Sequence, residues 1–196
     1  MSHENEGPKT DASQQVEHRF VPVRDDARVE ALVAELDGDR DRVLVFVRTK
    51  RGADRLVKRL GTHGVESLAI HGNKSQRQRD QALAGFQSGR VDTLVATDVA
   101  ARGIDVEGIT HVINFDPPGD HDAYVHRVGR TGRAGRSGVG ITLVAPGERR
   151  EMSLLAHRLG LRREFGLAAD RSESRSTQGA ADARRHRRRP GKRAAA

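Results

Sequence analysis

Four cationic side chains lie close together in the sequence HRVGRTGRAG, which runs from His126 to Gly135. They are one imidazole and three guanidinium groups, placed around bends that glycine allows because it has no Cβ to restrict the backbone. Cations packed this closely can reach one shared anion, and the planar fork of an arginine suits the oxygens of a phosphate. The segment therefore predicts a phosphate clamp.

Short apolar runs alternate with helical patterns along the chain, and together they must position these cations. The runs span residues 43–47, 68–70, 93–96, 111–115 and 141–144. Apolar residues recur at i, i+3, i+4 and i+7 within 29–36, 53–60 and 152–159, and Ser75 with Gln78 forms a possible capping box. Strands that are apolar on both faces belong in a covered parallel sheet. We therefore expect an α/β fold with a doubly wound, mainly parallel sheet flanked by helices.

Polar or glycine residues follow four of the apolar runs directly. They are Arg48-Thr49, His71-Gly72, Thr97-Asp98 and Asp116. Ligands of open α/β sheets bind at the carboxyl edge of the strands, so these residues are expected to line one rim. The alternative is that they only begin loops and cap helices, which is the favoured interpretation for Thr49 taken alone.

Composition bounds the domain organisation. The 196 residues and 35% hydrophobic content suit one ordinary domain, which we expect over residues 18–164. Residues 1–17 hold almost nothing that could be buried and are expected to form a flexible linker. Residues 165–196 are expected to form a disordered basic tail, because seven of the charges behind the net charge of +8 lie close together there. Such a block favours nucleic acid as a partner, although a solubilising tail is the alternative.

Several classes of protein are disfavoured by what the sequence lacks. There is no cysteine, which excludes disulfides and thiolate metal sites. No apolar run approaches the roughly 20 residues needed to span a bilayer, and the polar N-terminus lacks the core of a signal peptide. We therefore expect a cytoplasmic protein that makes no membrane contact.

Five sequence strings resemble, in order and approximate spacing, the motifs of the second (C-terminal) RecA-like helicase domain of DEAD-box RNA helicases. They are VLVFVRT, HGNKSQRQRDQALAGF, VATDVAARGID, INFDPP and HRVGRTGR, which span roughly residues 43 to 133. The histidine that opens the last string is similar to the DEAD-box form, whereas related DEAH-type motors usually carry glutamine there. The resemblance implies an ATP-dependent RNA helicase, which is an ATP hydrolase.

The resemblance also implies catalytic and nucleotide-binding residues. Arg130 and Arg133 would bind ATP and stabilise the charge of its γ-phosphate as arginine fingers, an effect on the order of 10³–10⁵ in rate. His126 would join them at the catalytic site. Together with Arg102, it would also couple this domain to its partner domain. Asp105 would accept a hydrogen bond from the ribose of ATP. Without the resemblance, the cationic segment could be a solvated basic helix end, and Asp105 a loop acid paired to Arg102.

A different set of residues is expected to bind RNA. Gln76 and Arg79 are three residues apart on one face of a helix start, where free backbone N–H groups favour a phosphate. By resemblance, these two residues contact the sugar-phosphate backbone of RNA together with the hydroxyls of Thr49 and Thr97, which implies little reading of base sequence. Aromatic residues make up only 3% of the chain, so base stacking cannot be the main grip. The alternative for Arg79 is an ion pair with Asp80 or another surface acid.

Half of a helicase active site is absent from the sequence. It contains no GxxxxGK[ST] loop for the phosphates of ATP and no Asp-Glu-Ala-Asp string for Mg²⁺. We therefore expect ATP with Mg²⁺ to be held mainly by an N-terminal RecA-like domain, no metal site in this chain, and no turnover by the chain alone. The other function classes are an autonomous RNA-binding module and a regulatory half that binds a protein. A DNA-directed relative is less favoured, since backbone contacts alone do not prove a need for the 2′-hydroxyl.

Overall fold

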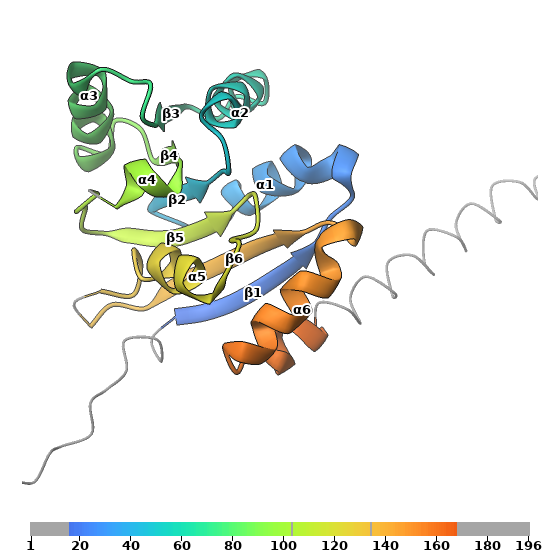
Figure 1. Cartoon of the computed structure of the whole chain (residues 1–196). Coiled ribbons are helices and arrows are strands. Elements are labelled where there is room, and N and C mark those ends of the chain that lie inside the picture. The colour runs from blue at the N-terminus through green and yellow to red at the C-terminus, as the bar shows by residue number, and fades with distance from the viewer. Residues whose placement is uncertain (1–15, 103, 134, 168–196) are drawn as a thin grey trace, which may run out of the picture.

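In the computed structural model, which describes residues 16–167 apart from 103 and 134, a central sheet is covered by helices on both faces (Figure 1). The strands are β1 (Val16–Pro22), β2 (Arg42–Phe46), β3 (Ser67–Ile70), β4 (Thr93–Ala96), β5 (Ile109–Asn114) and β6 (Gly138–Val144). The helices are α1 (Arg28–Leu36), α2 (Lys50–Thr62), α3 (Gln76–Gln87), α4 (Asp98–Ala101), α5 (His121–Val128) and α6 (Arg149–Arg158), with 3₁₀ turns η2 (Asp25–Ala27) and η3 (Pro146–Glu148). A further short helical segment covers residues 162–167.

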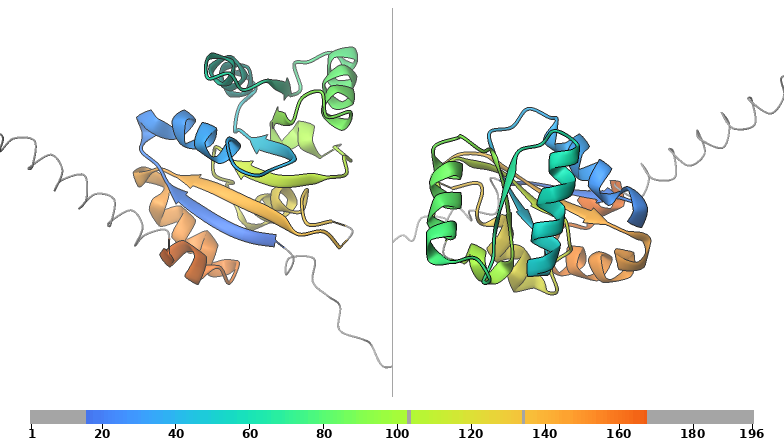
Figure 2. Two further views of the ribbon diagram at one scale, coloured as in Figure 1. Left: turned by 180° about the vertical axis from the view of Figure 1, so that it is seen from behind. Right: turned by 90° about the horizontal axis from the view of Figure 1, so that it is seen from above.

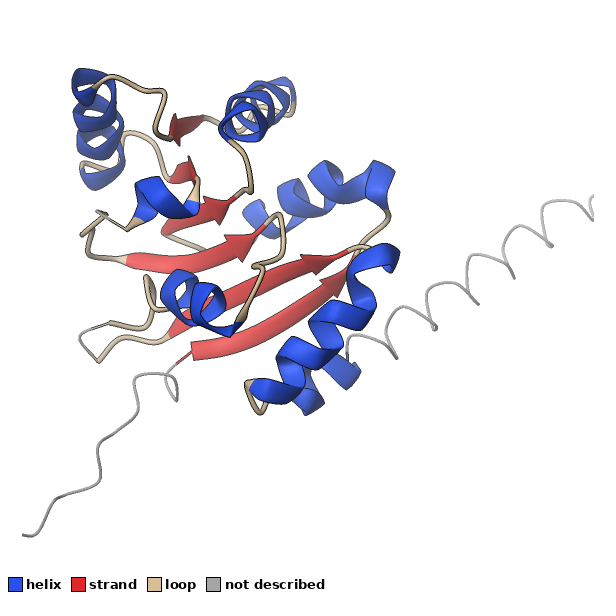
Figure 3. Cartoon of the chain, in the orientation of Figure 1, coloured by secondary structure: helices blue, strands red, loops and turns tan. Residues whose placement is uncertain are grey.

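The strands lie in the order β1-β6-β5-β2-β4-β3, and every neighbouring pair is parallel (Figure 3). The expected doubly wound α/β fold is therefore confirmed. Since all strands run in one direction, Thr49, His71, Thr97 and Asp116 lie at the same carboxyl edge of the sheet. The expected rim exists.

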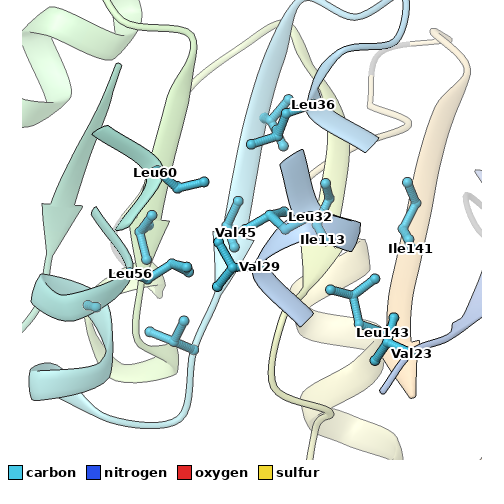
Figure 4. Packing of buried hydrophobic residues seen from close by; sticks show 14 residues of the cluster. Val23, Val29, Leu32, Leu36, Val45, Leu56, Leu60, Ile113, Ile141 and Leu143 are labelled. Carbon is cyan, nitrogen blue, oxygen red and sulfur yellow. The ribbon is translucent and has the colours of Figure 1, made fainter. Parts of the chain in front are cut away.

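Alternation along β2 explains why the sheet is covered twice. Val43 and Val45 pack under α1 and α2 together with Leu32 and Leu56 (Figure 4). The intervening residue Leu44 packs on the opposite face, in a second cluster built with α3 and α4. Successive side chains of a strand point to opposite faces, so a continuous apolar run satisfies both layers.

Strand β1 was not among the predicted strands. Its sequence VEHRFVP is half polar because it lies at the edge of the sheet, and only Phe20 is fully buried. Phe20 packs against Tyr124 and meets the ring of Phe165 edge-on at 5.2 Å between centroids. The ordered core thus includes β1 from Val16 onward and Phe165, both just outside the expected limits of 18 and 164. The basic residues of the tail lie outside the described residues.

Helix α3 starts as the sequence predicts. The Ser75 hydroxyl accepts a hydrogen bond from the backbone N–H of Gln78, whose side chain accepts one from the backbone N–H of Ser75. This capping box fixes the first turn of α3 and with it the positions of Gln76 and Arg79. In the described part of the chain, no helix has the length and apolar character needed to cross a membrane.

Candidate nucleotide and RNA site

Arg127 does not belong to the predicted cluster of free cations. Its guanidinium is buried and donates to both carboxylate oxygens of Asp98, at 2.6 and 2.7 Å. It also donates to the side chain of Asn114 and to the carbonyl of Asp116, and it lies over the ring of Phe46 at 5.1 Å. The bidentate ion pair joins the start of α4 to α5. Arg127 is therefore structural, and the clamp contains three candidate cations rather than four.

Helix geometry explains this difference and supplies the signal that sequence reasoning missed. Tyr124, Arg127 and Val128 are the buried residues of α5 and are spaced i, i+3, i+4. Arg127 therefore shares the inward face of the helix with two core residues. His126, one position earlier, is exposed on another face.

Arg130 and Arg133 extend from the turn that follows α5. Arg130 is half-buried, and its side chain donates to the carbonyls of Ile104 and His126, at 3.2 and 3.3 Å. Burial, and next the nearby charge of Arg133, lower the pKa of its guanidinium. Arg133 donates to the carbonyl of Gly129 at 2.7 Å and lies 3.6 Å from the carboxylate of Asp105. The two arginines are thus close enough for their charges to interact.

Asp105 does not form the ion pair with Arg102 that was the alternative to a ribose contact. The Asp105 side chain is 96% exposed and faces Arg133 rather than Arg102. An exposed pair of this length contributes little stability. Asp105 can therefore exchange Arg133 for another partner at low cost.

The turn that carries the arginines is anchored by a neighbouring hydroxyl. Thr131 is buried and donates to the carbonyls of Ile109 and Thr110, at 2.6 and 3.0 Å. A Cβ at Gly138 would lie 2.3 Å from the Thr131 hydroxyl, so only glycine lets β6 pass this close. Gly132 has a φ of 66°, a left-handed conformation that glycine adopts without strain. The arginines therefore project from a fixed turn.

Three of the predicted residues share a small cleft between α4 and α5. Arg102, His126 and Arg130 line it. Asp98 and Arg127, whose ion pair joins the two helices, also line it. The structure thus brings the proposed coupling residues next to one proposed finger.

Thr49 and Thr97 follow the neighbouring strands β2 and β4. The exposed Thr49 caps α2, and its hydroxyl oxygen accepts from the backbone N–H of Gly52 at 2.9 Å. The capping alternative for Thr49 is therefore realised, but the hydroxyl proton is left to donate to a ligand. Thr97 is buried at the start of α4, where its side chain makes no capping hydrogen bond.

Gln76 and Arg79 both lie in the first turns of α3. Asp80 accepts a hydrogen bond from the Gln76 amide at 2.7 Å, so the acid expected as an alternative partner of Arg79 is engaged elsewhere. Among the described residues, the Arg79 Nε is buried without a hydrogen-bond partner.

The donors of the candidate site residues suit anions better than metal ions. Guanidinium, imidazole, amide and hydroxyl groups donate to phosphate, while Asp105 offers an acceptor for a ribose hydroxyl. Within residues 16–167, apart from 103 and 134, no group of three or more His, Cys, Asp or Glu side chains is placed to hold a metal ion. This donor set does not fit Mg²⁺, which prefers several oxygen ligands.

Comparison with known proteins shows the family to which the chain belongs. Residues 27–135 match the family described as "Helicase conserved C-terminal domain". The chain is 49% identical over 125 residues to "ATP-dependent RNA helicase DBP2" of Candida albicans, which covers 64% of this chain but 22% of that protein. It is also 40% identical over 146 residues to "DEAD-box ATP-dependent RNA helicase RhpA" of Helicobacter pylori, which covers 74% of this chain and 30% of the relative. The chain thus spans less than a third of the length of these relatives.

A solved structure agrees with the sequence comparison. The crystal structure of a DEAD box protein from the hyperthermophile Methanococcus jannaschii superposes with a TM-score of 0.71 at 36% identity, over 77% of this chain and 42% of that one. The parallel sheet, the rim at its carboxyl edge and these similarities lead to one conclusion. The chain belongs to the DEAD-box RNA helicases, in which it forms the C-terminal RecA-like domain.

Proposed function

We propose that this domain completes the ATPase site of a two-domain RNA helicase. The observation that carries the proposal is the proximity of Arg130, Arg133 and Asp105, two cations and one acceptor. They lie beside the amino ends of β5 and β6, where Thr131 anchors the turn that carries the arginines. Arg130 and Arg133 act as arginine fingers on the γ-phosphate, and Asp105 binds the ribose. The phosphates and Mg²⁺ are held mainly by the N-terminal RecA-like domain.

When the two domains close, the arginines exchange their backbone acceptors for the oxygens of ATP. In the domain alone, the arginines donate to the carbonyls of Ile104 and Gly129, which hold them close to Asp105. The negatively charged oxygens of ATP are stronger acceptors than neutral carbonyls, so the guanidinium groups move to them on closure. The charge that develops in phosphoryl transfer is then neutralised, an effect on the order of 10³–10⁵ in rate.

The surface beside the arginines supports contact with a second domain. Val99 of α4 and Val125 of α5 are exposed apolar side chains, 75% and 47% accessible. They lie on the two helices that carry Arg102 and His126, the proposed coupling residues. Covering them on closure favours the closed state.

RNA binds at the carboxyl edge of the sheet, where β2, β3 and β4 end. Thr49, Gln76, Arg79 and Thr97 donate to the sugar-phosphate backbone, which positions a strand without reading its sequence. Because ATP and RNA both favour the closed state, each strengthens the binding of the other. A strand bent across the closed cleft excludes its complement, and hydrolysis reopens the cleft.

The first prediction is that the isolated chain shows no RNA-stimulated ATPase activity, because the sequence has no phosphate loop or Mg²⁺ ligands. Addition of an N-terminal DEAD-box half restores activity in a concentration-dependent manner, since two untethered halves must associate. Phosphate release by the chain, by the N-terminal half and by their mixture measures this. Turnover by the chain alone that Arg130→Ala abolishes would contradict the prediction.

A further inference from the structure

The loop between β3 and α3, residues 71–75, is held in place by helix α2. His71 is only 2% exposed, and its Nδ1 accepts a hydrogen bond from the backbone N–H of Asn73 at 3.3 Å. The proton of the neutral ring is therefore on Nε2, which lies 3.0 Å from a carboxylate oxygen of Asp54 on α2. The N–H and this oxygen are imperfectly aligned, so the contact is mainly electrostatic.

Asp54 holds the loop at a second point. Its other carboxylate oxygen lies 2.9 Å from the ammonium group of Lys74. The contact with Lys74, and next the contact with His71, lower the pKa of Asp54. One carboxylate on α2 thus contacts both ends of the segment from His71 to Lys74.

A parallel contact joins the same two elements. The Lys50 ammonium donates to the side-chain oxygen of Asn73 at 2.9 Å. Lys50 and Asp54 are four residues apart and therefore lie on one face of α2. That face contacts the loop through three pairs of side chains, two of which share Asp54.

These contacts connect the two helix starts that carry proposed RNA contacts. Thr49 caps α2 immediately before Lys50, while Ser75 caps α3 immediately after Lys74. Helices α2 and α3 lie on opposite sides of the edge strand β3, as the view from above shows (Figure 2). The loop contacts therefore fix the position of Thr49 relative to Gln76 and Arg79.

We propose that Asp54, His71 and Lys74 form a positioning set for the RNA backbone site, without touching RNA themselves. The inference rests on the proposed function, because it presumes that the two helix starts bind one strand. Phosphates along a strand have a fixed spacing, so contacts from separate elements must be held to within about 0.5 Å to act together. Loss of the Asp54 contacts lets the start of α3 shift relative to α2 and weakens the binding of RNA.

The test uses the whole chain and a fluorescein-labelled oligouridylate, with binding followed by fluorescence anisotropy at one salt concentration. Asp54→Asn removes the carboxylate charge, and His71→Leu removes both ring nitrogens at similar volume. Each is expected to weaken binding by about tenfold, the scale of one hydrogen bond to a charged group. His71→Gln keeps a donor near the position of Nε2, so it is expected to restore most of the affinity.

Two further measurements separate positioning from general damage. Glu66→Gln removes an exposed carboxylate on the segment before β3, and wild-type affinity is expected of it. In an Arg79→Ala background, Asp54→Asn is expected to cost much less than in the wild type, because its effect passes through Arg79. Melting temperatures show which variants are folded. The double-mutant cycle of Asp54→Asn and Arg79→Ala is calculated only from folded variants.

Each outcome decides a different question. If Arg79→Ala itself leaves affinity unchanged, the proposed RNA site is wrong and the inference falls with it. If Arg79→Ala weakens binding but folded Asp54→Asn and His71→Leu do not, the inference alone is overturned. Equal losses from Asp54→Asn in both backgrounds also overturn it, since a residue that acts independently of Arg79 does not position it.

Discussion

Arg127 and Arg130 carry the same guanidinium three residues apart and serve different purposes. Arg127 lies on the inward face of α5 and satisfies Asp98, Asn114 and a backbone carbonyl. Arg130 follows the end of the helix, where its donors engage only backbone carbonyls. A buried charged side chain that has a charged partner is costly to move, whereas one that donates to neutral carbonyls at a surface is not. Only the second kind can become a finger.

The finger assignment predicts a specific effect of Arg130→Lys in the complete two-domain protein. The substitution keeps the positive charge but replaces a planar fork of donors with one ammonium. Hydrolysis is expected to fall by at least tenfold, while RNA binding is retained. Steady-state ATPase rates and oligouridylate affinity measured on the same preparations check this.

Arg79→Ala supplies the matched comparison for Arg130→Lys. It is expected to weaken RNA binding first and to lower ATPase activity only through lost stimulation. If Arg130→Lys leaves the hydrolysis rate within about twofold of the wild type, well below the tenfold that corresponds to ~1.4 kcal/mol, Arg130 is not a finger.

At the scale of elements, the sequence predicts best the strands that are buried on both faces. Strands β2, β4 and β5 are apolar on both faces because they lie inside the sheet, and their sequences show it. Strand β1 lies at an edge, so its solvent-facing residues interrupt the pattern. Helix α5 was missed because the buried stripe that identifies it contains Arg127. Contacts between helices, such as the ion pair of Asp98 with Arg127, depend on how the helices pack on the sheet and have no local signal.

Strand β5 carries a titratable group that makes stability depend on pH. Burial, and next the charge of Arg19, lower the pKa of His111 below its usual value. The unfolded chain therefore binds more protons than the folded one once the pH falls below about 6.5, so stability decreases as the pH falls. This loss continues until the pH has passed through the lowered pKa of the folded state.

His111→Gln is expected to reduce that pH dependence. The free energy of unfolding, measured by urea denaturation at pH 7 and pH 5, should fall less in the variant than in the wild type. Because only the difference between the two pH values is compared, a change in packing common to both cancels. An equal or larger loss in the variant would show that His111 does not contribute.

At the scale of the whole molecule, the two sets of candidate residues lie at different edges of the sheet. The residues proposed to bind RNA follow β2, β3 and β4 at its carboxyl edge. Those proposed to bind ATP lie near the amino ends of β5 and β6, because the turn after α5 leads back into β6 and is hydrogen-bonded to the first residues of β5. This layout follows from the parallel sheet, which the sequence predicts. Helix α4 starts directly after Thr97 and ends shortly before Asp105, so in the proposed function it is the element that can couple the two sets.

The basic tail is predicted to add affinity without specificity. Seven of its cations lie within residues 184–193: Arg184, Arg185, Arg187, Arg188, Arg189, Lys192 and Arg193. Binding of these charges to phosphates releases counterions, and the salt slope of log affinity changes by roughly −0.7 per phosphate neutralised on a single strand. Deletion of residues 184–196 is therefore expected to weaken binding to different RNA sequences about equally and to flatten the salt dependence. Anisotropy titrations of two labelled oligonucleotides over a range of salt concentrations measure both effects, and an unchanged slope would leave the tail with a solubilising role.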